Sequence, residues 1–375
     1  MTRSLYGTVL AAKAVVGVLL VFVAAPGFAA SEADIDPHIL SEMKRLDADG
    51  DGKITPTEAG QHWKRFKRHD TDGDDALSLA EFSQRKVPYL PTKGQRKLNV
   101  VYKTTPLGEL RLDFYAPVDA SRPSPVVIYT HGGGWAAGNR HGAGLGRMKQ
   151  VLTALHEAGF AVAPVSYRLA TKENGTGMRD CVIDAKDAIR YLAKNHEALG
   201  IDPQRFFVFG DSAGGHIAQM LLLSPPSSLT GDPDLAGVDY RAVAGVSWYG
   251  PCDFEDVQLF NHDDRPNFHN RFARRIAPGK ATPQQLLKLS REMSPVRYLS
   301  ADSPPLLMIQ GDKDTTIPVK HAYRMQEEAQ KLGAPVEISI VKNSGHNWRS
   351  VGAPTQPTSD QIIDQTIGFL VGHEQ

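Results

Sequence analysis

Short apolar runs alternate with helical patterns along the chain from about residue 89 onward. The later runs are continuously apolar, as in parallel strands covered on both faces, and the stretches at 179–195 and 212–223 have the spacing of crossover helices. The first two runs lie close together like a hairpin. The pattern therefore predicts an α/β fold whose eight-stranded, mostly parallel sheet has helices on both faces and an antiparallel edge. The candidate strands are 98–102, 110–115, 126–130, 160–165, 205–209, 242–248, 305–310 and 336–341.

A different pattern occupies residues 1–30. Arg3 and Lys13 give a basic start, residues 14–25 are apolar and uncharged, and small residues follow up to Ala30. This order predicts a secretory signal peptide cleaved near Ala29 or Ala30. The apolar run is shorter than the roughly 20 residues of a comfortable membrane span, and an uncleaved N-terminal anchor is the alternative. We expect an exported protein, periplasmic or extracellular, without stable membrane insertion after cleavage.

Residues 34–88 contain two loops rich in aspartate. In the first, residues 47–58, carboxylates fall at positions 1, 3, 5 and 12, and Gly52 at position 6 permits a tight turn. Hard oxygen ligands at these offsets suit Ca²⁺, and the loop resembles an EF-hand. The resemblance predicts these calcium ligands: Asp47, Asp49, Asp51, the carbonyl of Lys53, and Glu58.

The second loop repeats the offsets but has Asp75 at position 6 instead of glycine, so we expect a weaker or empty site. Ile54 and Leu77 both occupy position 8, where paired loops meet through a short strand. Residues 59–69 leave room for one shared helix, as in the compact dockerin-like arrangement. The module is either a calcium sensor or docking unit, or a small domain stapled by its metal, and its small size favours the second. Its second ligand set is Asp70, Asp72, Asp74, the carbonyl of Ala76, and Glu81.

Two glycine-rich motifs follow predicted strands in the larger part of the chain. Residues 210–214 (Gly-Asp-Ser-Ala-Gly) lie between a strand and a helix, where a strained turn would expose the hydroxyl of Ser212. Residues 131–135 (His-Gly-Gly-Gly-Trp) would bring backbone N–H donors close to a developing oxyanion. We assign the oxyanion donors to Gly132, Gly133 and Ala213, with Gly134 as a close alternative, and expect His131 to brace this loop.

An acid and a histidine should follow the serine in chain order. Asp312 and Asp314 come after the 305–310 strand, and His346 comes after the 336–341 strand. A histidine takes the serine proton and returns it to the leaving group, and the acid orients the imidazole.

Together these motifs make residues 95–375 resemble an α/β-hydrolase of the esterase/lipase group that carries HGGGW and GDSAGG, which includes hormone-sensitive-lipase-like and feruloyl- or acetyl-esterase-like enzymes. The resemblance places the acid three residues after the glycine, at Asp314. It implies a serine carboxylic-ester hydrolase that acts through Ser212, His346 and Asp314 on small or carbohydrate-linked esters, with no cofactor for catalysis. Formamidases and serine peptidases of the same fold share similar motifs and are alternatives. A non-catalytic, calcium-dependent binding protein is a third.

We therefore divide the chain into a signal peptide (1–30), a calcium-binding module (34–88) and a catalytic domain (89–375). A segment at about 252–294 is expected to cover the active site. It is rich in arginine, so it is either a basic cap that receives an anionic group or a solvated helical face. Its basic side chains include Arg265, Arg271, Arg274, Arg275, Arg291, His262 and His269.

The composition of the chain argues against several classes of partner and of structural site. Lys and Arg number 42, as do Asp and Glu, so the net charge is zero, which argues against a nucleic-acid partner. The 2 Cys exclude a disulfide framework and a thiolate zinc cluster. In an oxidising compartment Cys181 and Cys252 either pair or remain free thiols, and the sequence leaves both open. The oligomeric state is not predicted.

Overall fold

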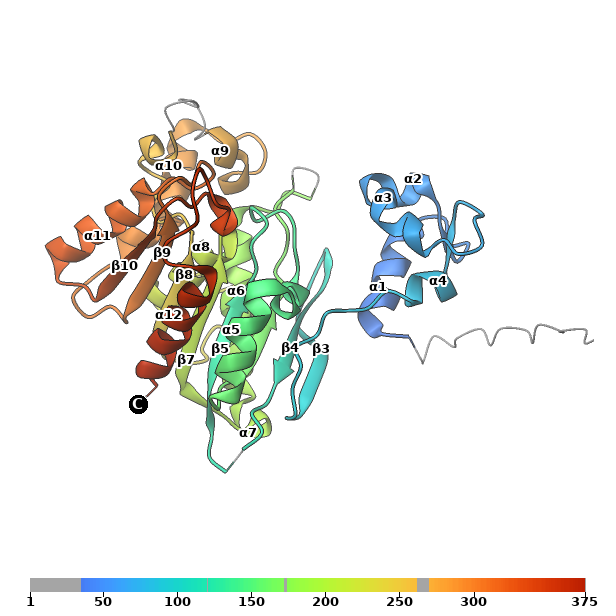
Figure 1. Cartoon of the computed structure of the whole chain (residues 1–375), viewed down its shortest axis with the longest axis horizontal. Helices are drawn as coiled ribbons and strands as arrows, with labels where there is room; N and C mark the ends of the chain where they lie inside the picture. Colours follow the sequence, from blue (N-terminus) through green and yellow to red (C-terminus); the bar gives the residue numbers. More distant parts are fainter. Residues whose placement is uncertain (1–34, 120, 172–173, 262–269, 375) are drawn as a thin grey trace, which may run out of the picture. The chain divides into compact units, whose positions relative to one another are not determined.

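The computed structural model describes residues 35–374 apart from 120, 172–173 and 262–269 (Figure 1). The predicted signal segment therefore lies outside the described residues. The chain divides into two compact units, one ending at Lys86 and the other spanning Val87–Gln375. Within the described ranges, no helix combines the length and the apolar character needed to cross a membrane.

The smaller unit is built around the two aspartate loops. Helix α1 (Pro37–Leu46) begins where the side chain of Asp36 accepts a hydrogen bond from the N–H of His38. Strand β1 (Lys53–Ile54) pairs antiparallel with β2 (Leu77–Ser78), which places Ile54 opposite Leu77 and confirms the predicted strand contact. The short helix α4 (Leu79–Ser83) closes the unit. The buried apolar side chains of the smaller unit include Ile39, Met43, Leu46, Ile54, Phe66, Leu77 and Phe82.

The segment between the two loops is not one helix, so that prediction is wrong. It consists of α2 (Pro56–Ala59) and α3 (Trp63–Phe66), separated and followed by 3-10 turns. Gly60, at φ +51°, leaves the helical region and ends α2. Phe66 is buried, whereas Trp63 is only half-buried.

The larger unit contains one eight-stranded sheet in the order β10-β9-β8-β7-β5-β6-β4-β3. All eight predicted strands are confirmed. The hairpin β3–β4 forms the antiparallel edge and the other neighbours from β6 to β10 are parallel. The strands are β3 (Arg96–Thr105), β4 (Gly108–Tyr115), β5 (Ser124–Thr130), β6 (Ala161–Val165), β7 (Ile201–Asp211), β8 (Ala242–Trp248), β9 (Leu306–Gly311) and β10 (Val336–Val341).

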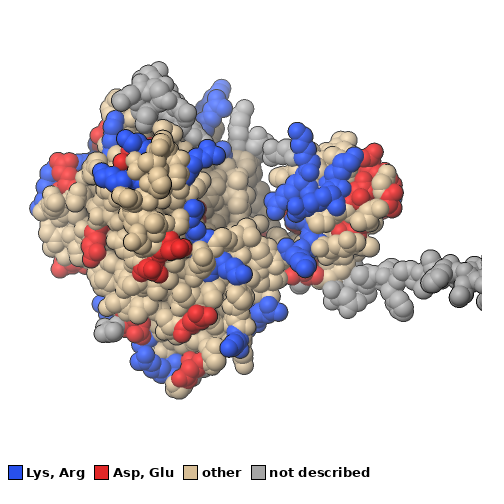
Figure 2. All heavy atoms as spheres, viewed as in Figure 1, with Lys and Arg blue, Asp and Glu red and all other residues tan. Residues whose placement is uncertain are grey.

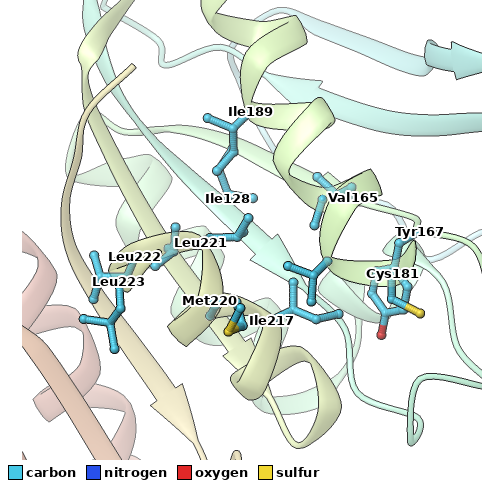
Figure 3. Close-up of a cluster of buried hydrophobic side chains, with 14 of the residues drawn as sticks. Ile128, Val165, Tyr167, Cys181, Ile189, Ile217, Met220, Leu221, Leu222 and Leu223 are labelled. Carbon is cyan, nitrogen blue, oxygen red and sulfur yellow. The ribbon is translucent and has the colours of Figure 1, made fainter. Parts of the chain in front are cut away.

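Helices cover both faces of this sheet (Figure 1). One buried cluster joins the sheet to α6 (Met178–Lys194), α8 (Ala213–Leu223) and α11 (Lys320–Leu332), and the other joins it to α5 (Gly146–Glu157) and α12 (Ser359–Gly372). Figure 3 shows part of the first cluster, in which Ile128 of β5 lies among side chains of α6 and α8. Burial on both faces explains why the central strands are apolar throughout. The remaining helices are α7 (His196–Leu199), α9 (Asn270–Ile276) and α10 (Pro283–Glu292).

Both cysteines are buried and neither is in a disulfide. The thiol of Cys181 contacts the carbonyl of Arg168, and that of Cys252 contacts the carbonyl of His321. Burial raises the pKa of both thiols well above the ordinary value. The structure therefore favours free, unreactive thiols over the pairing that the sequence left open.

Candidate active site

Ser212 lies at the turn between β7 and α8. Its φ of +53° is a strained conformation for a residue with a side chain, and it lifts the hydroxyl away from the strand. The turn is crowded: a Cβ atom on Gly214 would lie 2.0 Å from the carbonyl oxygen of Thr130. Glycine is therefore required beside the serine, as the Gly-x-Ser-x-Gly pattern implied.

His346 bridges Ser212 and Asp314. Its Nε2 lies 3.0 Å from the Ser212 hydroxyl, and its Nδ1 lies 2.7 Å from Oδ2 of Asp314. The three side chains, which are 134 and 32 residues apart in sequence, come together because β7, β9 and β10 end at the same edge of the sheet. This arrangement suits an imidazole that accepts a proton from the serine at Nε2 while its Nδ1–H donates to the carboxylate.

Asp314 is fixed by several hydrogen bonds. Its Oδ1 accepts from the N–H groups of Thr316 (2.8 Å) and Ile317 (2.9 Å), and its Oδ2 accepts from Nε2 of Gln310 (3.1 Å). These donors hold the buried carboxylate in the orientation that meets His346. The neighbouring Asp312 does not reach the histidine, because it accepts the N–H of Ser344 instead.

The glycine loop places its N–H groups differently from the sequence prediction. The N–H of Gly132 donates to Oδ1 of Asp211 at 3.0 Å, so it is not available to an oxyanion, and the assignment of Gly132 is corrected. In contrast, no acceptor in the described part of the chain meets the N–H of Gly133, Gly134 or Ala213. The structure thus retains Gly133 and Ala213 as candidate donors and favours Gly134, the close alternative, over Gly132.

Asp211 is a residue that sequence reasoning missed. Besides the Gly132 N–H, it accepts a hydrogen bond from the Tyr129 hydroxyl at 2.9 Å, so it joins β7, β5 and the glycine loop. Burial raises the pKa of Asp211, and these donors oppose that shift. The available signal was its place between Gly210 and Ser212, which the Gly-x-Ser-x-Gly pattern leaves open to any residue.

His131 braces the glycine loop, as predicted. Its ring stacks on Tyr167 with centroids 4.2 Å apart, its Nδ1 lies 2.8 Å from the Gly132 carbonyl, and the Tyr167 hydroxyl donates to the His131 carbonyl at 2.6 Å. Burial lowers the pKa of His131 to about 4, so the ring is neutral near pH 7.

Three aromatic rings, those of Trp135, His216 and Phe254, pack together beside the first turn of α8. Trp135, directly after the three glycines, donates through Nε1 to Nδ1 of His216 at 3.2 Å, and His216 donates through Nε2 to the Met293 carbonyl at 2.8 Å. Burial lowers the pKa of His216 to about 4. Phe254 lies edge-on to both rings. Both nitrogens of His216 are occupied, so its role is to connect α8 to the chain after α10.

Tyr249 is a second residue near the site that the sequence analysis missed, and no motif in the sequence marks it. It follows β8 in a strained conformation, φ +40°, and its ring centroid lies 4.8 Å from that of His346 and 4.6 Å from that of Trp348. These contacts restrict the imidazole to the position in which it meets Ser212.

The described part of the predicted cap is helical and its arginines mostly have partners. Arg291 pairs with Glu255 at 2.8 Å, and Arg275 donates to the carbonyl of Ala170. These contacts favour a solvated helical face over a receptor for anions. Of the other predicted basic groups, His262, Arg265 and His269 lie outside the described residues, as does the side chain of Arg271.

In the first aspartate loop, carboxylate oxygens of Asp47, Asp49 and Glu58 lie within 4.8 Å of one another. Asp51 is not in this group, and its Oδ1 accepts the N–H of Lys53 at 2.8 Å. Hydrogen bonds from Thr55 and from the N–H of Ala48 lower the pKa of Glu58 to about 2. A cluster of hard carboxylate oxygens is the donor set that Ca²⁺ prefers, so these residues fit the ion.

The second loop gathers Asp70, Asp72 and Asp74 in the same way. Asp75 adopts φ +57°, the conformation that glycine provides in the first loop. Glu81 stands apart from the three aspartates, with Oε1 2.7 Å from the N–H of Thr71. Burial opposes ionisation of Glu81, but its hydrogen bonds prevail and lower its pKa to about 2.

Comparison with known proteins gives the family of this chain. Residues 112–329, more than half of the chain, match the BD-FAE family. The chain belongs to the BD-FAE family. The match contains Ser212 and Asp314, whereas His346 and the smaller unit lie beyond it.

Curated relatives of this BD-FAE member include esterases. The probable carboxylic ester hydrolase LipM of Mycobacterium tuberculosis is 29% identical over 253 residues, which cover 67% of this chain and 55% of LipM. The isoprenylcysteine alpha-carbonyl methylesterase ICME of Arabidopsis thaliana is 28% identical over 302 residues, which cover 78% of this chain and 66% of ICME. The chain therefore spans between half and two thirds of the length of these relatives.

Solved structures confirm the predicted α/β-hydrolase fold. Thermogutta terrifontis esterase 2 phosphonylated by sarin aligns with a TM-score of 0.62 and 23% identity, covering 77% of this chain and 98% of that chain. The propionate-bound form of the same esterase aligns with a TM-score of 0.59, covering 77% of this chain and 97% of that chain. The family and these neighbours together confirm the resemblance to the α/β-hydrolase esterase group.

Proposed function

We propose that this protein hydrolyses carboxylic esters through an acyl-enzyme. The Ser212 hydroxyl attacks the ester carbonyl carbon while its proton passes to Nε2 of His346, and the N–H groups of Gly133, Gly134 and Ala213 stabilise the negative oxygen. Collapse of the tetrahedral intermediate breaks the bond to the alcohol, which takes the proton from His346. Water then attacks the acyl group by the same route, releases the acid and restores the serine.

The observation that carries this proposal is the continuous hydrogen-bonded line from Ser212 through His346 to Asp314, with distances of 3.0 and 2.7 Å. The buried carboxylate keeps the imidazole in the tautomer that has a lone pair facing the serine. The esterase names among the curated relatives support the same reaction.

Replacement of Ser212 by Ala tests the mechanism. We expect kcat for p-nitrophenyl acetate to fall by roughly 10⁴-fold or more, because the nucleophile is lost while the helix and sheet around it are unchanged. Circular dichroism checks that the variant is folded. Retention of most activity by a folded Ser212→Ala protein would refute the acyl-enzyme.

We infer that the substrates are small or carbohydrate-linked esters. The buried rings of Trp135, His216 and Phe254 pack against one another next to the glycine loop, so this side of the loop is closed by protein. Formamides and peptides are the competing classes for the same machinery. A hydrolysis screen across acetyl, feruloyl and longer acyl esters, formamides and peptide amides distinguishes them, and preference for an amide would overturn the ester assignment.

We also propose that the smaller unit binds Ca²⁺, which would be held by Asp47, Asp49, Asp51, the Lys53 carbonyl and Glu58 in the first loop. The second loop would use Asp70, Asp72, Asp74, the Ala76 carbonyl and Glu81, and would bind more weakly. Calcium would neutralise the charge of the carboxylates and stabilise the fold of this unit, whose hydrophobic core is small. Isothermal titration with calcium tests this, and no heat above that of a protein with Asp47→Asn and Asp70→Asn would refute it. The extracellular calcium supply suits the export that residues 1–30 predict.

A further inference from the structure

Basic side chains gather on the segment between the two aspartate loops. Residues 61–69 contain four Lys or Arg and no acid. Lys64, Arg65 and Arg68 are exposed and follow the spacing i, i+1, i+4, which places them on one side of a helical segment. We name these three residues the basic face. Figure 2 shows Lys and Arg collected over one side of the smaller unit and most of its acidic groups over another.

The charges of the basic face are not cancelled by nearby acids. The described residues of the smaller unit outside the two loops hold eight Lys or Arg side chains but only two acids, Asp36 and Glu42. Two other cations outside the loops have partners: Lys67 lies 2.8 Å from Asp75, and Arg85 lies 2.7 Å from Glu42. Among described residues, no carboxylate lies within ion-pair distance of the three cations of the basic face.

Lys64, Arg65 and Arg68 lie within five consecutive residues. A concentration of like charge is maintained here although it destabilises the folded unit through self-repulsion. Such a cost is expected where a surface attracts an oppositely charged partner.

The surroundings of the basic face discriminate between classes of partner. None of the large exposed apolar side chains of the described chain belongs to the smaller unit. Apart from the half-buried Trp63, the described residues of this unit therefore offer neither an exposed wedge for a lipid surface nor a cluster of large apolar anchors for a protein interface. Trp63, half-buried beside Lys64, offers a flat apolar face that suits a sugar ring.

We propose that the basic face binds an acidic polysaccharide whose repeating units carry carboxylates. Lys64, Arg65 and Arg68 contact successive carboxylates, and the affinity comes mainly from these charges, so it decreases as salt displaces the polymer. The surface gives the protein a second activity, retention on acidic carbohydrate, which does not depend on ester hydrolysis.

The test measures binding of the full chain to hyaluronan, a soluble polysaccharide with one carboxylate in each disaccharide unit, at about 1 mM calcium so that the smaller unit is loaded. Each basic side chain beside a dense negative charge contributes about a fivefold gain in affinity. We therefore expect the variant Lys64→Gln, Arg65→Gln, Arg68→Gln to bind roughly a hundredfold more weakly. Glutamine keeps helix propensity, so folding is preserved. Calcium titration and circular dichroism verify it.

The matched control is Lys93→Gln, Lys149→Gln, Lys280→Gln, which removes the same charge from exposed positions of the larger unit. It should bind hyaluronan like the unaltered protein, and neither protein should bind dextran, a neutral polysaccharide. Equal loss in the control, equal binding by the basic-face variant, or binding to vesicles of anionic lipid but not to hyaluronan would each overturn the proposal. Ester hydrolysis is measured separately, so failure of the catalytic proposal leaves this result intact.

Discussion

The two units of this chain use carboxylates in opposite surroundings. In the larger unit, Asp211 and Asp314 lie among backbone and side-chain donors at the sheet edge, where Asp211 meets the Gly132 N–H and Asp314 meets His346. In the smaller unit, Asp47, Asp49 and Glu58 come from one twelve-residue stretch and crowd together near solvent. In the first arrangement the carboxylates fix the groups that they contact, whereas in the second the carboxylates repel one another unless a cation lies between them. The comparison predicts that chemistry fails in one unit and stability in the other when acids are removed.

The largest expected effect on kcat comes from replacing Asp314, and replacing Asp312 in the same loop should have a much smaller effect. Asp314→Asn should reduce kcat for ester hydrolysis by about 10⁴-fold, because an amide donates to Nδ1 and selects the wrong imidazole tautomer. Asp312→Asn, two residues away, should change kcat by less than about tenfold, since Asp312 only accepts the Ser344 N–H. Steady-state kinetics on both variants decide the matter. Similar losses for the two would show that the loop, not the contact with His346, matters.

The next effect distinguishes two neighbouring glycines. A Cβ on Gly133 would lie 2.1 Å from the Ala137 carbonyl oxygen and its φ is +117°, whereas no atom lies within 4 Å of a Cβ on Gly134. Gly133→Ala should therefore displace the oxyanion donors and reduce kcat by about 10²- to 10³-fold. Gly134→Ala should cost less, although its φ of +61° still carries some strain. The opposite ranking would contradict this geometry.

Acid should unfold the larger unit first. Burial lowers the pKa of His131 and His216 to about 4 and that of His321 to about 3, from an ordinary value of 6.5. Below pH 6.5 these histidines are protonated in the unfolded chain but stay neutral in the folded chain. The free energy of unfolding therefore falls between pH 6.5 and about 4, by up to about 3 kcal/mol for each histidine.

The smaller unit should respond at lower pH. The pKa of Glu58 and of Glu81 is about 2 in the folded chain, against an ordinary 4.5. Their contribution is complete above pH 4.5 and is lost as the pH falls toward 2. Trp63 is the only tryptophan of the smaller unit in the sequence, so fluorescence of the protein with and without Trp63→Phe separates the two transitions. A single transition at one pH would contradict the predicted order.

The smallest effect on catalysis should come from calcium removal. Chelation should lower the melting temperature of the smaller unit and change kcat by less than about twofold, because no triad residue belongs to that unit. Glu58→Gln should weaken calcium binding more than Glu81→Gln, since the first loop has Gly52 at its turn and the second has the strained Asp75. A large, reversible loss of turnover on chelation would instead indicate regulation.

Most helices and strands could be predicted, because they depend on the order of apolar and polar residues that are close together in the sequence. The alternation of apolar runs and helical spacing located all eight strands, and the 12-residue aspartate loops followed from their offsets. The predicted helix at 59–69 failed because one glycine, Gly60, ends a segment too short to persist. The sequence therefore predicted the element types better than their continuity.

The sequence by itself determined which groups could react: a serine on a tight glycine turn, a histidine after the last strand, and carboxylates spaced for a cation. Only the tertiary structure decided which of them meet. In the folded chain the Gly132 N–H donates to Asp211, so Gly134 replaces Gly132 as a candidate oxyanion donor. Tyr249 lies against His346. These outcomes depend on strands that are distant in sequence and adjacent in the sheet, and hydrogen bonds of about 3 Å require positions that no local pattern specifies.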